Sequence, residues 1–199
     1  MTTQQTILFL AANPNGVNQR AFDREMRSMK DELKRSGSRD FKIEIGWAAG
    51  PLDLLRDLRE HRPTVVHFNG HGGDGGLYLQ DNDGDAKFVS THAIQQTFGA
   101  AGDSVKVVVL NSCYSDEQAE ALIAHVDCVV GMSGAISDAV TRQFAIGFYG
   151  GLGERESVAA AYAQGKASVS LAGLHWNSPP QLKVRHGVDA NRLILARRS

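Results

Sequence analysis

The stretch Thr64-Val65-Val66-His67-Phe68-Asn69-Gly70-His71-Gly72-Gly73 is an apolar run that breaks into glycines at a histidine. A second apolar run, Val105-Lys106-Val107-Val108-Val109-Leu110-Asn111-Ser112-Cys113-Tyr114-Ser115, ends at a cysteine. Both runs are too uniformly β-branched for half-exposed strands, so we expect buried strands of a parallel sheet. Ligands of open α/β sheets bind beyond the carboxyl ends of the strands. A histidine and a cysteine at two such ends, on neighbouring strands, would face the same crevice.

The rest of the chain alternates between strand and helix patterns. Buried strands are predicted at residues 6–12 and 126–132, an outer strand at 41–47, and weaker strands at 182–184 and 193–195. Helices are predicted between them, because apolar side chains recur there at helical spacing. The first helix, residues 18 to about 36, carries Phe22, Met26, Met29 and Leu33 on its apolar face. This order predicts an α/β sandwich around a mostly parallel sheet.

A short acidic segment between two apolar runs predicts a β-hairpin. Residues 75–80 and 86–89 flank the turn at 81–85, which consists of Asp, Asn and Gly. The turn resembles the start of a calcium loop. However, the sixth position is Ala86 rather than Gly, and the twelfth is His92 rather than Glu. We therefore expect an exposed hairpin and no metal.

Composition excludes several classes of protein. A chain of 199 residues can bury a core as one domain, residues 1–199, and is also compatible with a fragment of a longer protein. The net charge of −1 gives no electrostatic indication of nucleic acid or an acidic membrane as partner. We find no signal-peptide pattern and no run of 18 apolar residues. Two cysteines do not form a disulfide framework, which favours a reducing cytoplasm.

The two boxes carry a family resemblance. His67-Phe68-Asn69-Gly70-His71-Gly72 and Leu110-Asn111-Ser112-Cys113-Tyr114-Ser115 resemble the His and Cys boxes of caspase-like cysteine peptidases, the clan of caspases, metacaspases, separases and gingipains. More narrowly, they resemble bacterial CHAT domains, whose boxes read roughly H-F-S-G-H-G and L-N-A-C-x-S. Here the two reactive residues are 113 − 71 = 42 positions apart and the Cys box differs from the Q-A-C-x-G of caspases. The resemblance covers residues 7 to about 172 and implies a caspase-like three-layer α/β/α sandwich.

Cys113 and His71 are the candidate catalytic residues. Cys113 follows directly on a buried strand, and a neighbouring imidazolium would favour its reactive thiolate; the alternative is an inert buried thiol. His71, flanked by glycines, is predicted to be the general acid and base. His67 is interpreted as a core histidine and Cys128 as a core thiol. A zinc site of His67, His71 and Cys113 is the alternative to the Cys–His dyad; we expect no metal and no cofactor.

The resemblance also implies binding groups around the dyad. The backbone amides of Gly72 and Cys113 should form the oxyanion hole, where donors meet the developing negative charge. The positions expected to bind substrate are Asn13, Asn15, Asn111, Met132 and Ser133. Because these matched positions hold no charge, we expect cleavage after an uncharged residue, and a shift towards arginine in Asn111→Asp. The alternative is that Asn111 only braces the turn of the nucleophile.

The function implied by the resemblance is a cytoplasmic cysteine endopeptidase acting on a protein partner, with a sensor or activator protein, in prokaryotic antiviral defence or programmed cell death. Because residues 114–117 lead straight into helical sequence, activity should need no cut between Cys113 and Val126. One alternative is a catalytically silent signalling or interaction module. Another is a flavodoxin-like nucleotide-binding domain, which lacks a phosphate fingerprint and leaves the His box unexplained.

Overall fold

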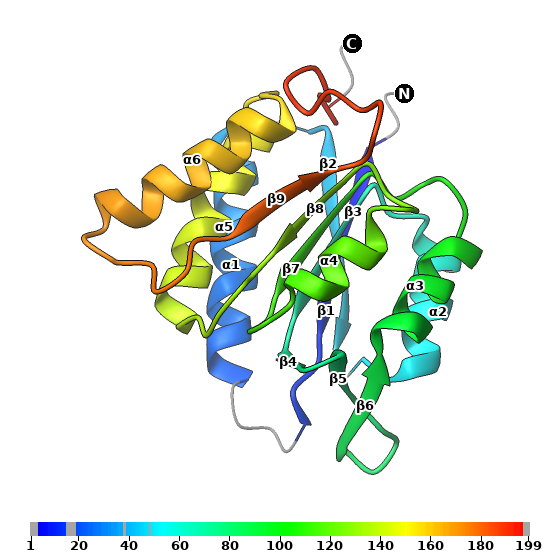
Figure 1. Cartoon of the computed structure of the whole chain (residues 1–199). Coiled ribbons are helices and arrows are strands. Elements are labelled where there is room, and N and C mark those ends of the chain that lie inside the picture. Colours follow the sequence, from blue (N-terminus) through cyan, green and yellow to red (C-terminus); the bar gives the residue numbers. More distant parts are fainter. Residues whose placement is uncertain (1–3, 15–18, 38, 48, 197–199) are drawn as a thin grey trace.

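The computed structural model describes residues 4–14, 19–37, 39–47 and 49–196. A six-stranded sheet forms the centre of this part of the chain, in the order β2-β1-β3-β7-β8-β9 (Figure 1). Five strands are parallel, and β9 pairs antiparallel to β8 at the edge. The predicted α/β class and mostly parallel sheet are therefore confirmed. The strand bounds are β1 Gln5–Ala11, β2 Phe41–Trp47, β3 Val65–Asn69, β7 Val107–Asn111, β8 Cys128–Gly131 and β9 Gln181–Val184.

Helices cover both faces of the sheet (Figure 1). One face packs against α1 (Gln19–Arg35), α5 (Asp138–Gly153) and α6 (Val158–Leu171), and the other against α2 (Pro51–His61), α3 (Thr91–Ala100) and α4 (Asp116–Leu122). Successive side chains of a strand point to opposite faces. In β1, for example, Ile7 and Phe9 join the core beneath α1 and α5, whereas Leu8 and Leu10 join the core beneath α2 and α3.

The predicted hairpin is confirmed and forms a second, smaller sheet. Strands β5 (Gly76–Gln80) and β6 (Ala86–Ser90) pair antiparallel, and the short strand β4 (His71–Gly73) pairs antiparallel with β5. The strand β4 was not predicted, since three residues with two glycines give no strand pattern. It places His71 opposite Tyr78.

Two details of the predicted elements need correction. Residues 193–195 are not a strand. Their apolar pattern reflects packing, because Leu195 is buried in the core and the backbone of Leu193 bonds to Val158 and Asp189. In α1, Met26 is only partly buried, and Glu25 lies on the buried side of the helix with Phe22, Met29 and Leu33.

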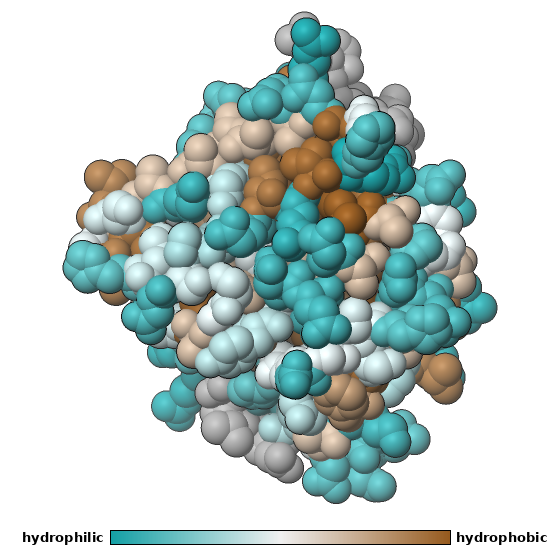
Figure 2. All heavy atoms as spheres, in the orientation of Figure 1, coloured by the Kyte–Doolittle hydropathy of each residue, from teal (hydrophilic) through white to brown (hydrophobic). Residues whose placement is uncertain are grey.

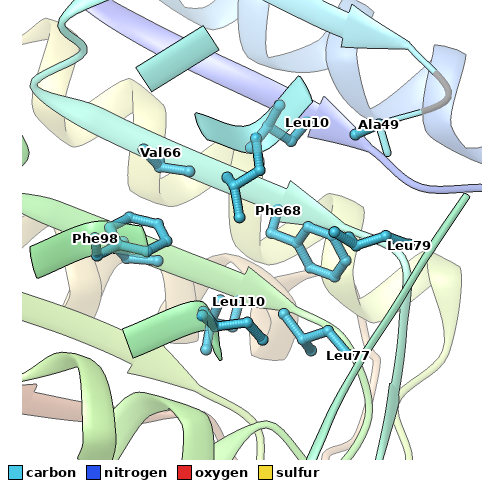
Figure 3. A pocket seen from close by; sticks show the side chains of 11 residues that line it. Leu10, Ala49, Val66, Phe68, Leu77, Leu79, Phe98 and Leu110 are labelled. Carbon is cyan, nitrogen blue, oxygen red and sulfur yellow. The ribbon is translucent and has the colours of Figure 1, made fainter. Parts of the chain in front are cut away.

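The face beneath α2 and α3 contains a small cavity lined only by apolar residues (Figure 3). Leu10, Phe68 and Leu110 of the sheet and Leu77 and Leu79 of the hairpin are among the residues that line it. No lining residue offers a polar group that would orient a ligand, so we treat this cavity as part of the core.

The surface in the same view is mostly polar, with apolar residues gathered over the upper part of β9 (Figure 2). Val184, the last residue of β9, is one of the large exposed apolar side chains. Among the described residues, none of the helices combines the length and the apolar character needed to cross a membrane.

Candidate active site

His71 and Cys113 lie at the same edge of the central sheet. Strands β3 and β7 are neighbours, and their last residues, Asn69 and Asn111, are register partners. His71 and Cys113 each follow two residues later, His71 exposed and Cys113 partly exposed. In Figure 1 this is the edge at which β4 and β5 lie across the ends of the parallel strands.

Gly72 brings the His box into contact with the Cys box. A Cβ atom at Gly72 would lie 2.0 Å from the carbonyl oxygen of Cys113 and 3.3 Å from Oγ of Ser112. Any side chain at this position would overlap the backbone of the turn at Cys113. Glycine is therefore required by close approach, and the residue after His71 lies directly against Cys113.

The turn after Cys113 is held by the side chain of Ser115. Tyr114 adopts a positive φ of 55°, which is strained for a residue with a side chain. The hydroxyl of the fully buried Ser115 lies 2.9 Å from the carbonyl oxygen of Ser112 and 3.1 Å from that of Leu110, and it accepts the N–H of Met132 at 2.9 Å. This hydroxyl ties the turn to strands β7 and β8.

The sulfur of Cys113 points towards the loop after β8. Its Sγ accepts a hydrogen bond from the backbone N–H of Ile136 at 3.4 Å. A hollow begins at this loop and extends to the loop before β9, whose Ser178 hydroxyl lies 2.5 Å from that of Ser133. The hollow is lined by Ala135, Ile136, Ser137, Val140, His175, Trp176, Asn177 and Ser178.

Gln118 of α4 connects the hairpin to the turn that follows Cys113. Its side chain is fully buried. With the amide oriented to satisfy both ends, its NH₂ group donates to the carbonyl of Tyr114 at 3.1 Å, and its oxygen accepts from the N–H of Gly76 at 2.9 Å and from Thr91 Oγ1 at 3.1 Å. The hairpin that carries β4 is thus fixed to the segment that follows Cys113.

Beneath His71 and Cys113 lies a buried polar network that the sequence did not reveal. The carboxylate of Glu25 contacts His67, Asn69 and Asn111, and His67 also contacts the hydroxyl of Tyr149. The predicted role of His67 as a core histidine is confirmed, since it is fully buried and both ring nitrogens are hydrogen-bonded. A carboxylate within an otherwise apolar helical stripe was the available signal for Glu25.

The predicted substrate-binding residues differ in accessibility. Asn13, Asn111 and Met132 are buried, and the amide of Asn111 is turned inward to Glu25, as expected if it braces the turn. Ser133 is exposed. Asn15 lies outside the described residues. The proposed contacts of these residues with a substrate remain predictions.

The remaining groups to consider are metal ligands and the two thiols. Among the residues that the structure describes, no group of three His, Cys, Asp or Glu side chains is arranged to hold a metal ion. Cys128 is buried, and burial, reinforced by the charge of Asp127, raises the pKa of its thiol to about 12. Its predicted place in the core is confirmed, which leaves Cys113 as the accessible thiol of the described chain.

The fold belongs to the class of caspase-like α/β proteins. A secreted C11 cysteine protease from Bacteroides thetaiotaomicron, solved with an irreversible peptide inhibitor, superimposes with a TM-score of 0.67 at 13% identity, over 85% of this chain and 59% of that one. The Arg-specific cysteine proteinase gingipain R superimposes with a TM-score of 0.58 at 11% identity, over 84% of this chain and 42% of that one. At such identities the likeness establishes the fold alone.

The chain is a member of the CHAT domain family, whose model matches residues 3–175. A Roc-COR-CHAT protease from an unknown prokaryotic organism is 25% identical over 178 residues, which are 84% of this chain and 17% of the relative. A probable protease of Gillisia limnaea is 26% identical over 129 residues, 63% of this chain and 23% of the relative. The chain thus spans less than a quarter of the length of these two relatives.

Proposed function

We propose that this CHAT domain is a cysteine endopeptidase that cleaves a protein substrate with a Cys113–His71 dyad. The observation that carries the proposal is the contact of Gly72 with the Cys113 carbonyl at the ends of β3 and β7. This contact brings together the His box and the Cys box, on which the reaction depends. The relatives named as proteases agree with the proposal.

In the proposed reaction the imidazole of His71 takes the proton of Cys113, and the thiolate attacks the carbonyl carbon of the scissile bond. The electron pair moves to the carbonyl oxygen, which the N–H groups of Gly72 and Cys113 stabilise. The C–N bond then breaks as His71 gives its proton to the leaving amine. Water, activated by His71, hydrolyses the thioester and regenerates the thiol.

The decisive experiment compares single variants of the two cysteines. Peptide chloromethyl ketones that differ in the residue before the reactive group should label the wild type at Cys113, and a matched peptide library should be cleaved. Cys113→Ala should abolish both activities, and Cys128→Ala should leave cleavage intact provided that it folds. For the histidine, His71→Ala should lose at least about 10²-fold in rate, whereas a variant of the exposed His92 on α3 serves as control.

The same library tests the expected preference for an uncharged residue before the cut. Strong preference for Arg, Lys or Asp would contradict it. Mass spectrometry of the active protein tests the second expectation, that no cut occurs between Cys113 and Val126, where the chain passes directly into α4.

The cellular role that we propose is prokaryotic defence or programmed cell death in the cytoplasm, with a sensor or activator controlling the peptidase. The relatives are more than four times as long as the part that matches this chain, which leaves room for such control in those proteins. Inducible expression in bacteria tests the role: wild type should slow growth when its activator and substrate are present, and Cys113→Ala should not. Growth arrest by both forms would favour the silent interaction module.

A further inference from the structure

Glu25 is a buried carboxylate on the sheet-facing side of α1, with 2% of its surface exposed. Its Oε1 lies 3.0 Å from Nε2 of His67 and also accepts from the amide of Asn111. Its Oε2 accepts from Nδ2 of Asn69 at 2.8 Å and lies 3.4 Å from Oγ1 of Thr141. Burying a carboxylate is unfavourable unless donors compensate it. Strands β3 and β7 supply three such donors, from His67, Asn69 and Asn111, and Thr141 of α5 supplies a fourth at longer range.

The hydroxyl of Tyr149 contacts the histidine of this network on the side opposite Glu25. Tyr149 is fully buried in α5, and burial together with the nearby Glu25 carboxylate raises the pKa of its phenol well above the ordinary value. The phenol therefore keeps its proton, and its oxygen lies 3.0 Å from Nδ1 of His67. In the tautomer whose Nε2 donates to the Glu25 carboxylate, Nδ1 accepts the hydrogen bond of the phenol. Phe9 stacks on the ring at 5.2 Å between centroids and holds its plane.

The network acts on the two strands that carry the dyad. Asn69 and Asn111 are opposite each other in the register of β3 and β7, and each is the last residue of its strand. Both donate to the one carboxylate of Glu25. His71 and Cys113 each come two residues later, so a movement of either strand end would displace a catalytic group.

We propose that Glu25 is a positioning residue for the Cys113–His71 dyad, which it aligns by clamping the ends of β3 and β7 through Asn69 and Asn111. The inference rests on the proposed peptidase function. Glu25 does not reach the surface, so it acts through these two amides and not on the substrate. A carboxylate suits the task because both of its oxygens accept, whereas a glutamine offers one acceptor and one donor.

The test is Glu25→Gln, which keeps the size of the side chain but replaces one acceptor oxygen with an NH₂ donor, so that a donor faces the amide donors of Asn69 and Asn111. We expect kcat on the library peptides to fall on the order of 10²-fold, the effect of small misplacements in an active site, with KM within about twofold of wild type. Glu32→Gln is the matched control, since Glu32 lies two turns further along α1 and pairs with Arg35 at the surface. The double variant Glu25→Gln/Asn111→Asp restores an acceptor opposite the new amide and should recover much of kcat.

A second measurement tests the role of Glu25 independently of peptide cleavage. The rate at which iodoacetamide alkylates Cys113 at pH 7 depends on the imidazole–thiolate pairing, and Glu25→Gln should lower it about tenfold. If wild type cleaves no peptide in the absence of its activator, kcat cannot be compared, and this rate still decides the role of Glu25. If Glu25→Gln does not fold, Tyr149→Phe, which removes one hydroxyl, should lower the same rate severalfold. The inference is overturned if Glu25→Gln folds and keeps both the kcat and the Cys113 alkylation rate of wild type. Where Glu25→Gln does not fold, a wild-type alkylation rate of Cys113 in Tyr149→Phe overturns it.

Discussion

The two faces of the central sheet are built from the same strands but differ in chemistry. Beneath α2 and α3, Val66, Phe68 and Leu110 line a wholly apolar core. Beneath α1 and α5, the alternate residues His67, Asn69 and Asn111 form a buried polar network. In β3 and β7 the buried polar side chains, His67, Asn69 and Asn111, all lie on the face beneath α1 and α5. If the proposed role of Glu25 holds, the apolar face of these strands supplies stability and the polar face aligns the proposed catalytic pair.

The largest effect is expected in a comparison of the two thiols, which tests whether water reaches the core beneath α1 and α5. Cys128 of β8 lies in the core of that face, and its thiol has a pKa raised to about 12 by burial. At pH 8 only about 10⁻⁴ of such a thiol is ionised, four pH units below its pKa. Iodoacetamide should therefore modify Cys113 and spare Cys128, and labelling of Cys128 should rise tenfold with each pH unit as far as the fold survives. Mass spectrometry checks both sites, and equal labelling of the two at pH 8 would mean that this face is solvated.

On the apolar face, Phe68→Ala should have the largest effect on folding. Phe68 is 4% exposed and lines the cavity of Figure 3, so removing its ring enlarges a void that the rigid strands cannot close. We expect the free energy of unfolding to fall by about 3–5 kcal/mol, measured by urea denaturation. The folded fraction should keep the Cys113 alkylation rate of wild type. A loss below about 1 kcal/mol would show that this face is loosely packed.

On the polar face, Asn111→Asp should destabilise by about 1–3 kcal/mol at pH 7, because a donor to Glu25 becomes a second buried carboxyl. Two carboxylates in contact cannot both stay ionised, so the folded variant retains a proton that the unfolded chain loses above about pH 4. Stability relative to wild type therefore falls as pH rises from 4 to 7. Thermal denaturation across this range measures it, with the exposed Asn177→Asp as control.

The same variant distinguishes the two roles of Asn111. A gain in cleavage after arginine would support a pocket edged by this residue, as the family resemblance implies. Loss of activity towards all library peptides alike would support the brace that the contact with Glu25 indicates.

The smallest effect is expected outside both faces, where Lys183 of β9 contacts Glu120 at 3.0 Å and Asp116 at 3.2 Å on α4. The hydrogen bond that Lys183 donates to Glu120, and then the one that it donates to Asp116, raise the pKa of Lys183. This stabilisation is present below about pH 10.4, the usual lysine pKa, and is lost as pH rises through the raised value. Because Lys183 is partly exposed and Glu120 is exposed, solvent screens these contacts, and Lys183→Met should lose less than about 1 kcal/mol. Urea denaturation at low and high salt checks this, and an effect above 2 kcal/mol would make the contact part of the core.

The sequence alone predicted the elements whose pattern is local. Uniform β-branched runs identified β3 and β7, turn residues identified the hairpin, and helical spacing identified α1 within one residue at each end. The pairing of a histidine and a cysteine at two strand ends followed from the general geometry of parallel sheets. These inferences need only the neighbours of a residue along the chain.

Only the tertiary structure decided what lies between those elements. Glu25, His67, Asn69, Asn111 and Tyr149 come from four separate elements and meet because the strand register and the packing of α1 and α5 bring them together. No local pattern encodes such a meeting, and a carboxylate in a helical stripe is usually at the surface. Likewise, that Gly72 lies against the Cys113 carbonyl depends on how β4 pairs with β5. The sequence thus determined which groups are the candidates for a reaction, and the packing of distant segments determined how they are held.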